Sequence, residues 1–193
     1  MEHLSKLQDF GIGKRCLIVG GGESLNKFQW DKLNGTYMIC TNDHYSQMAD
    51  MIIYYDRHMK KHYSQHCVSN ETLLVGFKNV NSAGGVIDYT VERCDYYYSY
   101  DDMVFGDSGF HALQFADRIL NFSHIYLIGF DYETTEKSYH HNEDVSDPKM
   151  MKKFKTWSIG KVLKEYDKIK WANEIYNCNK NSKLEVFGHG FPY

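Results

Sequence analysis

A run of three glycines near the N-terminus is the part of this sequence best suited to chemistry. Residues 16–25 are Cys-Leu-Ile-Val-Gly-Gly-Gly-Glu-Ser-Leu, an apolar run followed by Gly20, Gly21 and Gly22. The run predicts a buried strand, and Ser24 predicts the cap of a following helix. A glycine turn between a strand and a helix presents backbone N–H groups to a phosphate. We therefore expect these glycines and Ser24 to bind the phosphates of a nucleotide, although a purely structural turn has the same pattern.

The spacing Gly20-x-Gly22-x-x-Leu25 is that of a dinucleotide fingerprint without its third glycine. Asp43 follows the turn by about twenty residues, where a dinucleotide-binding fold places its ribose-binding acid. A nicotinamide-dependent oxidoreductase is therefore a formal alternative, disfavoured by the missing glycine and by the lack of a recognisable hydride-transfer site. Asn42 and Asp43 follow a predicted strand, so we expect them to contact the nucleotide.

A second candidate anion site is the segment Asp107-Ser108-Gly109, which begins a predicted helix. A capping hydroxyl from Ser108 and close backbone approach at Gly109 would suit an anion at the helix N-terminus. The alternative interpretation is an ordinary N-cap.

A polar stretch, residues 132–147, carries the candidate catalytic groups. Histidine side chains ordinarily titrate near neutral pH, so His140 or His141 could act as a general base, and a surface pair is the alternative. Asp131 and Glu133, which follow a predicted strand, could hold Mg²⁺ on a pyrophosphate, or they could cap the backbone.

Three further histidines lie four residues apart, which places them on one face of a predicted helix. They are His58, His62 and His66. A straight helix cannot bring the outer two to one ion, so we interpret this face as solvated rather than metal-binding.

Strand and helix signals alternate along the chain, which predicts an α/β fold with a mostly parallel sheet. After the first strand, strands are expected at 36–41, 51–55, 71–75, 95–99, 125–128 and 174–178. Helices are expected at 24–33, 108–120 and 148–166, and a loop at 79–86. Residues 132–147 are too long and polar for an ordinary connection and predict a lid or active-site loop. Polar residues follow almost every strand, at the edge where such sheets bind ligands.

The composition limits the partners. The 193 residues fit one domain, and the net charge of −3 provides no basic field for nucleic acid or an anionic membrane. The five cysteines are dispersed, without a C-x-x-C pair, as expected of reduced thiols in the cytoplasm. No apolar run is long enough to span a membrane, and the N-terminus lacks the apolar core of a signal peptide.

Six segments match a set of motifs that occur in the same order in known proteins. The first is Gly20-Gly21-Gly22-Glu23-Ser24-Leu25, which is similar to a G-x-G-P-S-L turn. The others, in chain order, are Cys40-Thr41-Asn42 with R-C-N, Asp107-Ser108-Gly109 with T-S-G, Ile125–Asp131 with I-Y-L-x-G-x-D, Ser138-Tyr139 with S-Y, and Ile175–Cys178 followed by the N-S of Asn181-Ser182. Through these motifs the chain resembles two related Rossmann-like groups. These are the bacterial α-2,3/2,8 sialyltransferases that use CMP-sialic acid and the 6-hydroxymethylpterin diphosphokinase-like group, which includes many small phage proteins.

The resemblance implies a single Rossmann-like nucleotide-binding domain over residues 1–193, with helices on both faces of the sheet and a lid at about 132–147. It implies a glycosyltransferase-like enzyme that uses a nucleotide-activated sugar and needs no cofactor. In that enzyme Asn42 would contact the nucleotide sugar, Tyr139 would steady the leaving phosphate, and His140 or His141 would deprotonate the acceptor. The family's turn asparagine is Gly21 here and its proline is Glu23, so the resemblance does not imply CMP-sialic acid as the donor.

Two other functions fit the same resemblance. One is a Mg²⁺-dependent diphosphotransferase of the 6-hydroxymethylpterin diphosphokinase type, with Asp131 and Glu133 as metal ligands. The other is a catalytically inactive nucleotide-binding protein, such as a phage accessory protein in the host cytoplasm. Related enzymes assemble through their helices, so a homo-oligomer is compatible with the resemblance, and nothing in the composition requires one.

Overall fold

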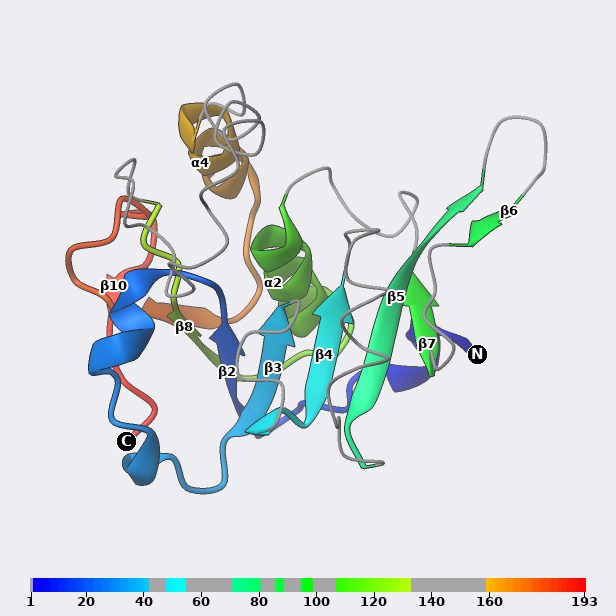
Figure 1. Cartoon of the computed structure of the whole chain (residues 1–193), viewed down its shortest axis with the longest axis horizontal. Helices are drawn as coiled ribbons and strands as arrows, with labels where there is room; N and C mark the ends of the chain where they lie inside the picture. Colours follow the sequence, from blue (N-terminus) through cyan, green and yellow to red (C-terminus); the bar gives the residue numbers. More distant parts are fainter. Residues whose placement is uncertain are drawn as a thin grey trace.

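The structure, a computed structural model, describes residues 2–41, 48–54, 71–80, 86–88, 95–98, 107–132 and 159–193. In these residues the chain forms one ten-stranded sheet (Figure 1). The strand order is β1-β7-β5-β4-β3-β2-β8-β9-β10, and β6 pairs with β5 off this path. Every pair is parallel except β5 with β6. The predicted α/β fold with a mostly parallel sheet is confirmed.

The elements have the following bounds. The strands are β1 (Glu2–His3), β2 (Arg15–Val19), β3 (Tyr37–Thr41), β4 (Met51–Tyr54), β5 (Leu73–Val80), β6 (Val86–Asp88), β7 (Tyr96–Tyr98), β8 (His124–Ile128), β9 (Glu174–Asn177) and β10 (Gly188–His189). The α-helices are α2 (Ser108–Arg118) and α4 (Ile159–Lys168), and the 3-10 helices are η1 (Leu4–Leu7), η2 (Glu23–Lys27) and η3 (Trp30–Lys32).

Two sequence predictions about these elements were wrong. The helix expected over 24–33 is the pair of short helices η2 and η3, because Phe28 is extended between them, and the N-cap residue of η2 is Gly22 rather than Ser24. The loop expected over 79–86 was wrong at both ends, because Asn79 and Val80 belong to β5 and Val86 belongs to β6, with which β5 pairs. The short strands β1 and β10 were not predicted; both are held by pairing with a neighbouring strand.

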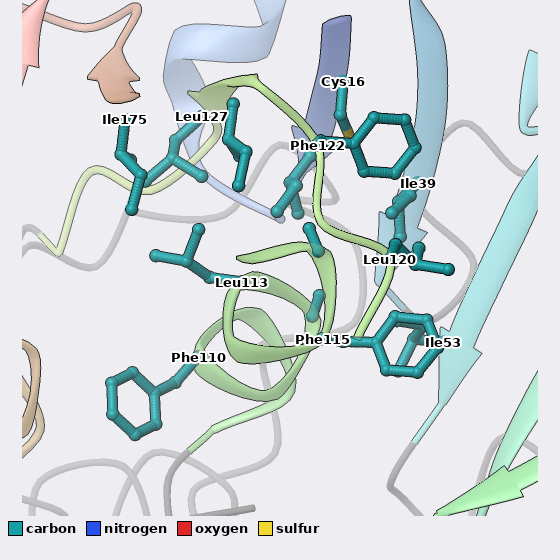
Figure 2. Packing of buried hydrophobic residues seen from close by; sticks show 14 of the residues in the cluster. Cys16, Ile39, Ile53, Phe110, Leu113, Phe115, Leu120, Phe122, Leu127 and Ile175 are labelled. Carbon is teal, nitrogen blue, oxygen red and sulfur yellow. The ribbon is translucent and has the colours of Figure 1, made fainter. Parts of the chain in front are cut away.

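The sheet is covered on both faces, as expected. Side chains of β2 alternate between two buried clusters, with Ile18 in one and Val19 in the other. The first cluster is covered by α2, whose Leu113 and Phe115 lie among the buried side chains in Figure 2, and by α4. The second cluster is covered by η2 and the segment after it. No helix in the described residues is long and apolar enough to cross a membrane.

The strand order reverses its direction at β2. From β2 the chain continues to β3, β4 and β5 on one side, whereas β8, β9 and β10 lie on the other (Figure 1). Open α/β sheets bind ligands beyond the carboxyl ends of the strands at such a switch point. Here those carboxyl ends lead into residues 20–24 after β2 and 129–132 after β8.

Candidate functional site

The glycine turn after β2 packs directly on the end of β8. The N–H of Gly20 donates to the carbonyl of Ile128 and that of Gly22 to the carbonyl of Gly129, both at 2.8 Å. A Cβ on Gly20 would lie 2.6 Å from the Gly129 oxygen, and a Cβ on Gly22 would collide with the Asp131 carboxylate. The glycines are therefore needed for close backbone packing. Because these two N–H groups are already used within the fold, a ligand at the turn must be bound by other atoms.

Asp131 connects the ends of three strands. Its side chain is buried, with 5% of the residue exposed. One carboxylate oxygen accepts from the Ser24 N–H, and the other accepts from the Asn179 side-chain amide, both at 2.8 Å. The Asp131 carbonyl accepts from the Lys183 N–H at 3.0 Å. Both carboxylate oxygens are thus held by N–H donors, which fixes the orientation of this group between β2, β8 and β9.

The Ser24 hydroxyl also serves this junction rather than capping a helix. Its oxygen accepts from the Gly129 N–H at 3.1 Å. Gly129 has a φ of +76°, in the left-handed region that glycine adopts at low cost. The turn after β2 and the turn after β8 are therefore joined through both backbone and side-chain hydrogen bonds.

A pocket of about 340 Å³ opens beside this junction. Its size is at the lower end of the range of small-molecule sites. The lining mixes carboxylates, amides, an ammonium group and aromatic rings; it consists of Glu23, Ser24, Lys27, Phe28, Ile128, Asp131, Cys178, Asn179, Asn181 and Phe191. Burial raises the pKa of the Cys178 thiol to about 12. Cys178 is therefore no thiolate nucleophile at neutral pH.

The second candidate anion site, at the start of α2, is occupied by a carboxylate of the chain itself. Asp107 is the N-cap residue, and its side chain accepts from the Phe110 N–H at 2.7 Å. The expected capping role of Ser108 was wrong, because Ser108 is already the first helical residue. A Cβ on Gly109 would lie 2.6 Å from the Phe130 ring, so this glycine, too, permits close packing on the end of β8.

Asp107 belongs to a partly buried network that reaches α4. Its second oxygen accepts from the Tyr132 hydroxyl at 2.9 Å, and that hydroxyl lies 2.7 Å from the hydroxyl of Tyr166. Burial raises the pKa of Asp107, while hydrogen bonds from Phe110 and Tyr132 oppose the rise. Burial also raises the pKa of both tyrosines well above 10, so they stay protonated. The network connects the start of α2, the end of β8 and α4.

Several predicted site residues lie outside the described residues, so their roles stay predictions. These are Asn42, Asp43, Glu133, Tyr139, His140 and His141, and the same holds for His58, His62 and His66 and for the lid beyond Tyr132. In the part of the chain that the structure describes, no group of three or more His, Cys, Asp or Glu residues could hold a metal ion.

The structure adds pocket residues that the sequence analysis did not assign to a site. Asn179 follows the last predicted strand, so it could have been found by applying the strand-end rule to that strand as well. Asn181 was noted only as part of a matching segment. Lys27, Phe28 and Phe191 had no local signal, because they reach the pocket from η2 and from the segment after β10.

The fold and the pocket define a Rossmann-like α/β protein with a ligand-sized pocket at the switch point of its sheet. No model of a known protein family matches the chain, and no curated protein matches it. Among solved structures it is similar to the sialyltransferase CstII from Campylobacter jejuni, solved in complex with the substrate analogue CMP-3FNeuAc. The TM-score is 0.52 and the identity 18%, over 91% of this chain and 85% of that one. At this identity the likeness concerns the fold.

Proposed function

We propose that this protein is a glycosyltransferase-like enzyme that uses a nucleotide-activated sugar. The observation that carries the proposal is the pocket at the carboxyl ends of β2, β8 and β9, in a fold similar to that of a sialyltransferase solved with a CMP-sugar analogue. Ligands of open α/β sheets bind at this place. The pocket has the polar groups that a nucleotide needs, since carboxylate, amide and ammonium side chains line it together.

Different described residues would bind different parts of the ligand. Lys27 supplies a positive charge for a phosphate, because the N–H groups of Gly20 and Gly22 are occupied. Asn179 and Asn181 carry amides that can bind neutral hydroxyl or ring groups. The fixed carboxylate of Asp131 can accept from a hydroxyl or an amino group of the ligand.

The transfer step itself would use residues of the lid. An acceptor hydroxyl would attack the anomeric carbon, forming the new glycosidic bond while the bond from that carbon to the phosphate oxygen breaks. The hydroxyl proton would go to His140 or His141, and the nucleotide would leave with its phosphate steadied by Tyr139. These three roles come from the family resemblance.

The first experiment is a thermal-shift screen with CMP, CMP-sialic acid, UDP- and GDP-sugars, ATP and GTP, each with and without Mg²⁺. A ligand at 100 times its Kd stabilises the fold by about 2.7 kcal/mol, which is readily measured. We expect stabilisation by a nucleotide sugar without metal, followed by release of the nucleotide when an acceptor is added. If no compound in the panel raised the melting temperature, the proposal would be overturned.

Two other outcomes would change the assignment. Stabilisation only by ATP or GTP with Mg²⁺ would support a diphosphotransferase, and binding without turnover would support a nucleotide-binding accessory protein of the phage type. Lys27→Ala tests the pocket itself: we expect it to weaken binding about tenfold, roughly 1.4 kcal/mol. Lys6→Ala is the matched control, since Lys6 is exposed and does not line the pocket.

A further inference from the structure

An aromatic ring from the segment after β10 forms one wall of the pocket. Phe191 lines the pocket and is nevertheless 40% exposed. The chain reaches it from β10, which pairs with β9, and then continues toward η2 and η3 (Figure 1). A half-exposed phenylalanine in a pocket that otherwise carries mostly polar groups presents a flat apolar surface to a ligand.

The ring is held in place before any ligand binds. Phe191 stacks on Tyr193 with ring centroids 5.3 Å apart and an interplanar angle of 19°. His189 makes an edge contact with it at 5.1 Å. The Tyr193 ring also contacts the Phe28 ring, with centroids 6.2 Å apart. The Lys32 ammonium lies 5.3 Å from the centroid of the Tyr193 ring. A ring that is already fixed loses little conformational freedom on binding, which favours affinity.

The backbone of this segment is anchored as well. The Arg15 guanidinium donates to the carbonyl of Pro192 at 2.6 Å and to the carbonyl of Asn34 at 3.1 Å. Pro192, which lies between Phe191 and Tyr193 in the sequence, is buried, whereas those two residues are exposed. The segment that carries the Phe191 ring is therefore anchored to Arg15 at the start of β2 and, through Tyr193, to Phe28, which also lines the pocket.

The other pocket groups suit the edge of a planar heterocycle. Asn179 and Asn181 line the pocket and carry amides that can both donate and accept. The carboxylates of Glu23 and Asp131 lie in the same lining and can accept a hydrogen bond from an amino group of the ligand. A nucleotide base combines a flat π surface with donors and acceptors at its edge.

We propose that Phe191 is the platform on which the base of the bound nucleotide stacks, with the Asn179 and Asn181 amides at the edge of that base. This inference rests on the proposed use of a nucleotide-activated sugar and assigns the base to one wall of the pocket. Stacking on an aromatic side chain tolerates any base, so the amide groups would provide the selectivity.

The test compares Phe191→Leu and Phe191→Trp with the unaltered protein by calorimetric titration of CMP, UMP, AMP and GMP. We expect Phe191→Leu to lower the affinity for the best-binding nucleotide about 5- to 150-fold, which is the range for the loss of one base–aromatic stacking contact. Phe191→Trp should retain the affinity, and the fluorescence of its new indole should be quenched when the nucleotide binds. All variants should melt within a few degrees of the unaltered protein, since the altered ring is exposed.

Phe10→Leu is the matched control. Phe10 is 38% exposed and contacts the aromatic rings of Tyr37 and Phe122, but it does not line the pocket. We expect unchanged nucleotide affinity in this variant. Nucleotide binding that is equally tight in Phe191→Leu would overturn the stacking proposal and leave the proposed function standing. An unaltered protein that binds no nucleotide or nucleotide sugar would overturn both.

Discussion

The turn after β2 and the start of α2 both bring a glycine against the end of β8, and among the residues that the structure describes the turn, not the helix start, lines the pocket beside this junction. Gly22 packs on Asp131, and Gly109 packs on the Phe130 ring. The turn continues into Glu23 and Ser24, which line the pocket. The helix start is instead capped by the half-buried side chain of Asp107. The comparison shows that a glycine beside a helix start permits close packing in both places, and that close packing alone does not indicate a ligand site.

The largest effect is expected at the turn. Gly22→Ala would place a Cβ against the Asp131 carboxylate and 2.8 Å from the Gly129 oxygen, and both neighbours are held by hydrogen bonds. We expect the free energy of unfolding to fall by about 1–3 kcal/mol, the usual cost of overpacking, and nucleotide binding to fall with it. Urea unfolding and calorimetric titration measure the two effects.

The control for this variant is Gly188→Ala. A Cβ there would meet only Tyr176, at 3.8 Å, which is ordinary van der Waals contact. Its stability and binding should stay unchanged. If Gly22→Ala were as stable as this control, the close packing at the β2–β8 junction would not be needed.

A smaller effect is expected at the helix start. Asp107→Ala removes the cap of α2 and the acceptor of the Tyr132 hydroxyl, which keeps Tyr166 as its partner. Loss of an N-cap costs about 1 kcal/mol and up to about 2. Because Asp107 does not line the pocket, nucleotide binding should persist. Loss of binding in a folded Asp107→Ala protein would show that the helix start, too, serves the ligand.

The smallest effect is the pH dependence contributed by Asp107. Burial raises the pKa of this carboxyl above its ordinary value of 3.8. The folded state therefore keeps the proton at pH values where the unfolded chain has released it. The contribution of Asp107 to the free energy of unfolding is highest below pH 3.8 and falls as the pH rises through the raised pKa.

Asp107→Asn isolates this contribution, because the amide does not titrate and can still cap the helix. We expect the free energy of unfolding of the unaltered protein, minus that of the variant, to decrease as the pH rises from about 4. Urea unfolding of both proteins between pH 4 and 7.5 measures the difference. A difference that is constant or increases with pH would contradict the raised pKa.

Much of the fold could be predicted because its signals are local. The apolar runs of β2, β3, β4 and β8 were placed within a residue or two, and the segment Asp107-Ser108-Gly109 was correctly placed at the start of α2. The strands β1 and β10 could not be found, since each has two residues and is held by its neighbour in the sheet. The prediction of one helix over 24–33 was wrong because the short-range pattern of this segment does not distinguish a 3-10 turn from an α-helix.

The sequence by itself determined the α/β alternation, the glycine turn and the position of Asp131 after a strand, because hydrophobic periodicity and turn chemistry act between near neighbours. The tertiary structure decided what those residues do. Ser24 and Asp131 are 107 residues apart and meet only because β2 and β8 are adjacent in the sheet. The junction of the two turns uses the N–H groups of Gly20, Gly22 and Ser24, which the turn after β2 would otherwise offer to a phosphate. It also leaves the pocket to side chains such as Asn179 and Phe191, which are brought there by chain segments distant in the sequence.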